Sequence, residues 1–210
     1  MARWRCSATP TATSGTCCNM PPDSKHVDQP AGSGNGMLAI ERHRHHDLPQ
    51  ARREQLRALA GEAFDRFPIV RETRWATPDW TFLGTDDRGE LACFYHLVER
   101  VVRMDGQPVA VAGLHNLITT QPYRGRGLAS ELLAATGQVW FSAMAARYGL
   151  LLCAGALVPF YERLGWQRVS AEVRFEQPGG MRTWTAECML LDPAGDAVDP
   201  AVVDLCGLPW

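Results

Sequence analysis

A glycine-rich turn between an apolar run and a helical pattern constrains this chain more than any other feature. The apolar run ends at Thr120, the helical pattern starts near Leu128, and the turn between them reads Gln121-Pro122-Tyr123-Arg124-Gly125-Arg126-Gly127. Glycine lets the backbone take a positive φ and approach a ligand closely. A helix N-terminus attracts phosphate, and two arginines add charge-assisted donors. The turn therefore predicts a strand–turn–helix unit that binds a pyrophosphate, although it matches neither GxxxxGK[ST] nor GxGxxG.

Composition and charge narrow the class of protein. Of 210 residues, 46% are hydrophobic and 21% are charged, and the net charge is −2. These values are typical of a soluble domain and predict neither a nucleic-acid partner nor a membrane partner. The seven cysteines form no CxxC pair, so no metal site is expected. We interpret them as free thiols in the reducing cytoplasm, with a catalytic thiol at Cys153 as the alternative.

The first 36 residues differ from the rest. Residues 1–36 are rich in Ser, Thr, Pro and Gly and lack an apolar signal segment. Such a segment buries too little apolar surface to offset its ordering entropy. We expect residues 1–36 to be a flexible leader or a non-native upstream extension, and residues 37–210 to form one catalytic domain.

Hydrophobic periodicity predicts an α/β domain with a mixed sheet from Met37 onward. The Asp105-Gly106 pair predicts a tight hairpin turn between two long strands, and Gly149 is expected to end the second helix. The expected strands are 38–42, 80–85, 91–104, 109–120, 150–153, 169–175 and 183–191, and the expected helices are 50–65, 128–147 and 159–163.

Two motifs resemble those of the GCN5-related N-acetyltransferase superfamily. Arg124-x-x-Gly127-x-Ala129 resembles the acyl-CoA loop of that family. Phe160-Tyr161-Glu162-Arg163-Leu164-Gly165-Trp166 is similar to its helix-to-strand element, in which the tyrosine faces the cofactor sulfur. The resemblance implies the acetyltransferase fold with a splayed central sheet, and acetyl-CoA as cosubstrate.

The resemblance also implies where the cofactor lies. Two splayed strand edges, Leu117-Ile118-Thr119 and Cys153-Ala154, would hydrogen-bond the pantetheine amides in the manner of an added strand. The pyrophosphate would rest on the N–H groups of Arg124, Gly125, Arg126, Gly127, Leu128 and Ala129.

A narrower resemblance points to the aminoglycoside 2′-N-acetyltransferases. Its basis is the Leu164-Gly165-Trp166 turn, the Met181-Arg182-Thr183 segment and the tail 203–210, which contains a cysteine and finishes on Trp210. The resemblance implies acetylation of the 2′-amino group of an aminoglycoside-type antibiotic, with resistance as the result. It also implies that the Trp210 carboxylate reaches the amino-sugar site.

One departure from that group concerns the general base. Where the group has a glutamate, this chain has Leu114-His115-Asn116. His115 is predicted to accept the acceptor proton, directly or through water, and the alternative is a core histidine. A histidine lowers the negative field around the substrate, which favours a less charged amino sugar such as kasugamycin. Tyr161 is predicted to donate to the departing CoA thiolate.

Aromatic and acidic residues supply candidates for the acceptor site. Trp75 and Trp80 flank a proline-containing loop and are predicted to wall the pocket, with core packing as the alternative. The candidate partners of an acceptor ammonium are Asp65, Glu72, Asp79 and Glu187. His43, His45 and His46 are interpreted as an exposed connection, with metal binding as the alternative.

Two other functions stay open. The chain could acetylate a protein or a small metabolic amine, or it could bind acyl-CoA without catalysis. A homodimer also stays open, because nothing in the sequence decides the oligomeric state.

Overall fold

A ten-stranded mixed sheet organises the part of the chain that the structure describes. The computed structural model describes residues 38–210, so the predicted leader, residues 1–36, lies outside the described residues. The strand order is β6-β9-β5-β4-β3-β10-β7-β8, with β2 beside β3 and β1 beside β2. The strands are β1 (Ala39–Arg44), β2 (Trp80–Thr85), β3 (Leu91–Met104), β4 (Gln107–Thr119), β5 (Tyr148–Cys153), β6 (Gln167–Val169), β7 (Glu172–Gln177), β8 (Gly180–Thr183), β9 (Glu187–Leu191) and β10 (Val202–Asp204).

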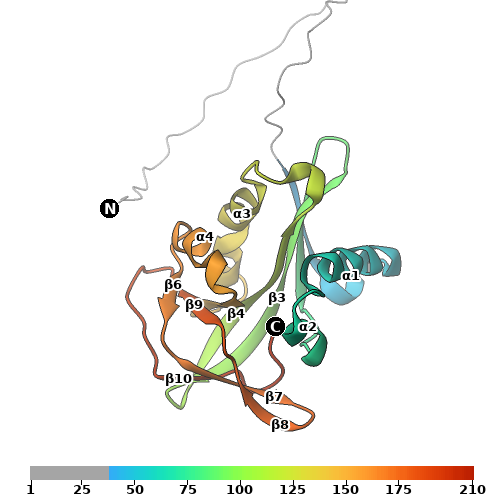
Figure 1. The fold of residues 1–210 in the computed structure, drawn as a ribbon. Helices are drawn as coiled ribbons and strands as arrows, with labels where there is room; N and C mark the ends of the chain where they lie inside the picture. Colours follow the sequence, from blue (N-terminus) through green and yellow to red (C-terminus); the bar gives the residue numbers. More distant parts are fainter. Residues whose placement is uncertain (1–37) are drawn as a thin grey trace, which may run out of the picture. The chain divides into compact units, whose positions relative to one another are not determined.

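Helices cover both faces of this sheet (Figure 1). α1 (Gln50–Phe64) and α2 (Pro68–Glu72) lie on one face, and α3 (Leu128–Ser142) and α4 (Val158–Glu162) lie on the other. Three short 3₁₀ turns join the elements: η1 (His45–Asp47), η2 (Gln121–Tyr123) and η3 (Gly155–Leu157). The predicted α/β fold with a mixed sheet is confirmed.

The long hairpin of β3 and β4 is the centre of the sheet. Its register runs from Met104↔Gln107 to Cys93↔Thr119. The turn residues Asp105 and Gly106 have φ of 49° and 81°, the positive values that a two-residue hairpin turn needs. The predicted hairpin is confirmed.

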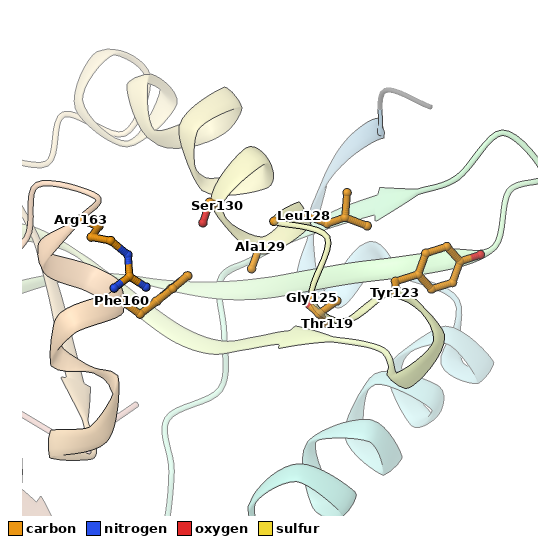
Figure 2. A pocket seen from close by; sticks show the side chains of 9 residues that line it. Thr119, Tyr123, Gly125, Leu128, Ala129, Ser130, Phe160 and Arg163 are labelled. Carbon is orange, nitrogen blue, oxygen red and sulfur yellow. The ribbon is translucent and has the colours of Figure 1, made fainter. Parts of the chain in front are cut away.

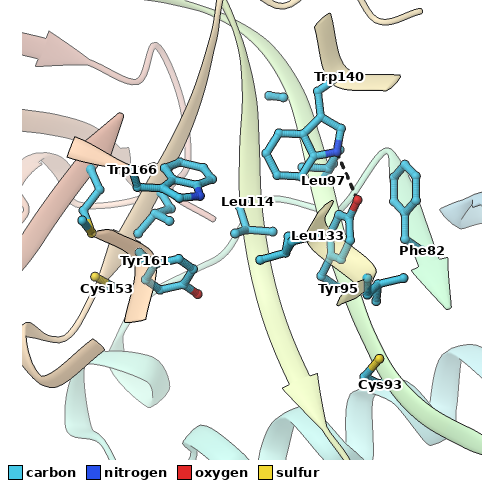
Figure 3. Packing of buried hydrophobic residues seen from close by; sticks show 14 of the residues in the cluster. Phe82, Cys93, Tyr95, Leu97, Leu114, Leu133, Trp140, Cys153, Tyr161 and Trp166 are labelled. Carbon is cyan, nitrogen blue, oxygen red and sulfur yellow. Dashed lines mark hydrogen bonds between the residues drawn. The ribbon is translucent and has the colours of Figure 1, made fainter. Parts of the chain in front are cut away.

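Apolar clusters on the two faces hold the helices to the sheet. On the α3 side, Leu132, Leu133 and Trp140 pack against the sheet (Figure 3). There the Trp140 indole N–H donates to the Tyr95 hydroxyl at 3.0 Å. On the opposite face, Leu56 of α1 packs with Phe94 and neighbouring residues.

The predicted helix 128–147 is too long. α3 ends at Ser142, and Ala145 has a φ of 53°, which reverses the chain. Gly149 does not cap the helix, because it lies in β5 opposite Ala112. A Cβ at Gly149 would lie 3.0 Å from the Trp166 ring, so close packing rather than helix capping requires this glycine.

The predicted C-terminal strands are also wrong in part. Residues 169–175 divide into β6, which pairs with β9, and β7, which pairs with β10 and β8. Residues 183–191 divide into the end of β8 and β9. β10 and α2 were not predicted, because each is only a few residues long.

Candidate active site

β4 and β5 separate where the predicted cofactor edges lie. The parallel pairing runs from Val111↔Tyr148 to Leu114↔Leu151, and no β4–β5 pair follows within residues 38–210 although β4 continues to Thr119. A register shift opposite β3 and the positive φ of Asn116, 50°, mark a bulge at this point. Bulges bend the strand and end its pairing. The predicted splayed sheet is confirmed, and the backbone of residues 117–119 lies on the open edge.

The glycines of the turn keep the space above it open. Gly125 and Gly127 have φ of 75° and 78°, and Gly127 is the N-cap of α3. A Cβ built on either residue would meet no heavy atom within 4 Å. Glycine is therefore not needed here to avoid a steric clash. It is needed because the backbone adopts the left-handed conformation. The empty space over a helix N-terminus suits an anionic group.

A pocket of about 340 Å³ lies over this turn (Figure 2). Of the predicted cofactor residues, Thr119, Gly125, Gly127, Leu128 and Ala129 line it. Its other lining residues, which sequence reasoning missed, are Tyr123, Ser130, Phe160 and Arg163. Phe160 and Arg163 could have been found, because they flank Tyr161 in the quoted motif at a spacing that shares a helix face.

The remaining predicted cofactor residues lie around the pocket. The Arg124 guanidinium donates to the Thr119 carbonyl at 3.2 Å, and that of Arg126 lies 5.4 Å from the centre of the Tyr123 ring. The side chains of Leu117 and Ile118 pack on opposite faces of the sheet. Their predicted contribution is therefore through the backbone.

Tyr161 is buried on the α4 side. Its ring packs edge-on against Phe160 and Trp166, with centroid distances of 5.0 and 5.9 Å. Its hydroxyl points toward β4 (Figure 3). Burial raises the pKa of Tyr161, so the phenol keeps its proton and can donate a hydrogen bond.

Cys153 begins the second predicted edge. Its side chain is buried, and burial raises the pKa of its thiol to about 11. The nucleophilic form of cysteine is the thiolate. The raised pKa therefore argues against a catalytic thiol, and the buried side chain is that of a core residue. The backbone of Cys153 lies beyond the last pair between β4 and β5.

His115 lies on the face opposite Tyr161, between two aromatic rings. It is paired with His96 across β3 and β4. Its ring centroid lies 6.0 Å from that of Trp75 and 6.1 Å from that of His96. Burial lowers the pKa of His115 to about 4, although a hydrogen bond to the backbone of Trp210 acts in the opposite direction. The imidazole is therefore neutral at pH 7.

Trp75 and Trp210 lie beside His115 on this face, and Trp184 packs against Trp75. Trp184 stands edge-on to Trp75 at 6.1 Å. The Trp210 indole lies over Gly113, where any Cβ would overlap it. Trp75 and Trp210 were predicted for the acceptor site, and the structure brings both to His115. Trp184 was missed, because it lies between β8 and β9 in a segment predicted to be one strand.

Several hydrogen bonds hold Trp75 in place. Its indole N–H donates to the Val70 carbonyl at 3.0 Å. The Gln177 amide bonds both the N–H and the carbonyl of Arg74, at 2.8 and 2.9 Å. The Ala76 N–H donates to the Pro209 carbonyl at 2.8 Å. These hydrogen bonds fix the position of Trp75 beside His115.

Two of the predicted acceptor carboxylates, Asp79 and Glu187, already have protein partners, whereas Asp65 and Glu72 are exposed. Asp79 accepts the Glu99 N–H at 2.8 Å, and Glu187 forms a bidentate ion pair with Arg168. Trp80 packs with the α3-side cluster, under the Arg44 guanidinium at 3.7 Å. The structure therefore brings Trp75, and not Trp80, beside His115.

Comparison with known proteins identifies the family. Residues 46–169, more than half of the chain, match the sequence profile of the Acetyltransferase (GNAT) domain. The chain belongs to the GNAT acetyltransferase family. It is therefore an acyltransferase, and acetyl-CoA is its cosubstrate. The open glycine turn and the separated β4 and β5 edges fit this cosubstrate. A comparison with curated protein sequences found no match.

Solved structures share this GNAT fold. ElaA of Escherichia coli has a TM-score of 0.54 at 18% identity over 74% of this chain and 100% of its own. YhbS of Escherichia coli, solved in complex with CoA, has a TM-score of 0.52 at 19% identity over 86% and 93% of the two chains. An acyl-CoA N-acyltransferase from Pseudomonas aeruginosa has a TM-score of 0.50 at 16% identity over 73% and 99%. At these identities the likeness concerns the fold.

Two further observations bear on partners of this GNAT protein. No helix within residues 38–210 is long and apolar enough to cross a membrane. Over the same range, no three His, Cys, Asp or Glu side chains are grouped so that they could hold a metal ion.

Folding stability is expected to fall as the pH drops from about 6.5 towards 4. Burial lowers the pKa of His115 from 6.5 to about 4, so the unfolded chain binds more protons than the folded chain in this window. At about 1.4 kcal/mol per pH unit, His115 contributes a loss of up to about 3 kcal/mol. Urea titrations at pH 7 and 4.5 measure this loss. His115→Gln should reduce the difference between the two pH values, and an unchanged difference would contradict the assignment.

Proposed function

We propose that this GNAT enzyme acetylates the 2′-amino group of a small aminoglycoside-type sugar that carries little positive charge. Kasugamycin is the first candidate, and modification of such an antibiotic would confer resistance. The observation that carries the proposal is a neutral imidazole, His115, between the Trp75 ring and the backbone of Trp210.

The groups around His115 favour a ring with few charges. The C–H face of a sugar stacks well on an indole, and the indoles of Trp75 and Trp184 stand edge-on at an interplanar angle of 75°. A polycation needs several carboxylates to offset its charge. Of the predicted carboxylates, Asp79 accepts a hydrogen bond from the Glu99 backbone N–H, and Glu187 is paired with the Arg168 guanidinium. A strongly cationic aminoglycoside therefore fits less well.

The proposed chemistry is direct transfer of the acetyl group from acetyl-CoA to the amine. His115 and Tyr161 act on this transfer from opposite faces of the sheet. His115 accepts the proton of the attacking amine, directly or through water. Backbone N–H groups near Leu117, on the open edge of β4, stabilise the oxyanion. Tyr161, which keeps its proton, donates to the departing CoA thiolate.

Measurement of CoA release over a panel of amines tests the proposal. The panel holds kasugamycin, a polycationic aminoglycoside, an aromatic monoamine and a lysine peptide. We expect the highest kcat/KM for kasugamycin. A higher value for the peptide would replace the proposal with protein acetylation. Tight binding of acetyl-CoA without CoA release from any amine would favour a non-catalytic acyl-CoA module.

Trp75→Ala is expected to raise KM for the amino sugar about tenfold, with the acetyl-CoA Kd unchanged. The expected loss is one ring contact of about 1.4 kcal/mol. Steady-state kinetics and calorimetry measure the two constants. Trp80→Ala is the matched control, because Trp80 packs with the cluster on the α3 side. Equal effects of the two substitutions on KM would remove Trp75 from the acceptor site.

A small aromatic or apolar amine is the second candidate. The same tryptophans, with Trp210 on Gly113, form a wall that also accepts a flat apolar ring. A kcat/KM for the aromatic monoamine above that for kasugamycin would make it the substrate class.

A further inference from the structure

A line of polar side chains crosses the sheet behind His115. Thr81, on β2, is fully buried, and its hydroxyl lies 2.9 Å from the Nδ1 atoms of both His45 and His96. His96 is 4% exposed and lies between the aromatic ring of Phe94 and the ring of His115. Buried polar groups in an apolar sheet cost stability unless they are hydrogen-bonded. Here the Thr81 hydroxyl satisfies both imidazoles, so the three side chains form one continuous hydrogen-bonded line.

The shared hydroxyl couples the two imidazoles. A threonine hydroxyl donates one proton and accepts through its lone pairs. If the Thr81 hydroxyl donates to Nδ1 of His96, then Nδ1–H of His45 donates to the Thr81 oxygen. In the reverse arrangement, Nδ1–H of His96 donates to the Thr81 oxygen and the hydroxyl donates to Nδ1 of His45. Transfer of one proton along the line therefore switches both rings from one neutral tautomer to the other.

The line leads from the acceptor side of β4 to the surface. His96 is the cross-strand partner of His115, and the two rings stack with an interplanar angle of 29°. At the other end, His45 lies in η1 and is partly exposed. Burial lowers the pKa of His45, and Arg53, Arg57 and His46 lower it further. Burial also lowers the pKa of His96, with the charges of His115 and His45 adding to the effect. All three rings are therefore neutral at pH 7.

We propose that His96, Thr81 and His45 are positioning residues of a proton relay that carries the acceptor proton away from His115. The amine N–H bond breaks as His115 takes the proton, which passes through one water molecule to Nε2 of His96. His96 then gives its Nδ1 proton to the Thr81 oxygen, and the Thr81 hydroxyl proton moves to Nδ1 of His45. His45 releases its Nε2 proton to solvent. One proton enters and one leaves, so no ring keeps a charge. Both rings end in the opposite neutral tautomer, and they must return to the first tautomer before the next turnover.

This inference rests on the part of the proposed function that makes His115 the base, and it does not depend on which amine is the substrate. A base whose pKa is lowered to about 4 holds a proton only briefly near pH 7. An exit for that proton therefore affects kcat more than it affects the binding of either substrate.

Thr81→Val and Thr81→Ser form the matched pair that tests the relay. Valine keeps the shape and removes the hydroxyl, whereas serine keeps the hydroxyl. We expect Thr81→Val to lower kcat about tenfold or more, with KM for the amine and Kd for acetyl-CoA unchanged, and Thr81→Ser to restore kcat. The solvent deuterium isotope effect on kcat should change in the valine variant. His45→Gln, at the partly exposed end, should lower kcat in the same way without a loss of thermal stability.

A second readout needs no substrate. Nitrogen-15 NMR of the wild-type histidine rings should show His45 and His96 in linked neutral tautomers, and Thr81→Val should change both together. Unchanged tautomers in the valine variant would overturn the relay, as would equal kcat values in the valine and serine variants. If the wild-type enzyme turns over none of the panel amines, the proposed substrate fails. Unchanged tautomers in the valine variant would still overturn the relay in that case.

Discussion

Replacing Gly127 with aspartate is expected to abolish measurable binding of acetyl-CoA and to leave the fold intact. The new side chain would project into the open space above the turn, where a Cβ meets no protein atom within 4 Å. It would place a negative charge beside the predicted pyrophosphate site at the start of α3. Like charges in a partly dry site repel by several kcal/mol, and about 3 kcal/mol already weakens binding more than a hundredfold. Isothermal calorimetry measures the Kd, and circular dichroism checks the fold.

Gly127→Asn is the control for charge. Asparagine has the shape of aspartate and a similar tolerance for the left-handed backbone that Gly127 adopts at φ 78°. We expect the asparagine variant to bind acetyl-CoA much more tightly than the aspartate variant. Equal losses would mean that the backbone and not the charge matters, and normal binding by both would place the pyrophosphate elsewhere.

Removing the Tyr161 hydroxyl is expected to lower kcat by roughly 10²–10⁴-fold, the range of general acid catalysis. Tyr161→Phe keeps the ring that packs on Phe160 and Trp166, so the acetyl-CoA Kd should change little. Because burial raises the pKa of Tyr161, the lost group is a protonated donor near neutral pH. Single-turnover kinetics separates the chemical step from product release.

Tyr95→Phe is the control for loss of a buried hydroxyl. Tyr95 is also buried, and its hydroxyl bonds Thr136 and the Trp140 indole on the α3 side. We expect this change to lower stability by about 1–3 kcal/mol, because it leaves the Trp140 donor unpaired, and to leave kcat unchanged. If Tyr161→Phe also leaves kcat unchanged, thiolate release needs no acid and Tyr161 is structural.

Local chemistry made much of the fold and of the cofactor side predictable. β2 and β3 have the predicted bounds, because runs rich in valine and aromatic residues end at strong turn residues. The glycine turn and the Tyr161 motif are continuous in sequence. The pocket therefore forms between the unit of β4, the glycine turn and α3 and the later helix α4, which carries the Tyr161 motif.

The acceptor side was less predictable, because it depends on pairings between distant segments. Trp75, Trp184 and Trp210 come together only after the loop before β2, the chain after β8 and the tail have packed. The Thr81–His96 contact likewise depends on the register of β2 on β3. A single sequence shows none of these registers. The contact between Gly149 and the Trp166 ring also joins segments that are separate in the sequence. The sequence alone therefore predicted a helix cap at Gly149.

β10 joins two parts of the sheet and is the last strand along the described chain. It pairs antiparallel with β3 on one side and parallel with β7 on the other. Among the described strands, the hairpin of β7 and β8 is therefore joined to the central strands of the sheet by the backbone pairing of β10. Contacts between residues so distant in the chain form slowly. We expect the acetyl-CoA side, built from residues 107–163, to become structured early in folding, and the acceptor side to be completed last.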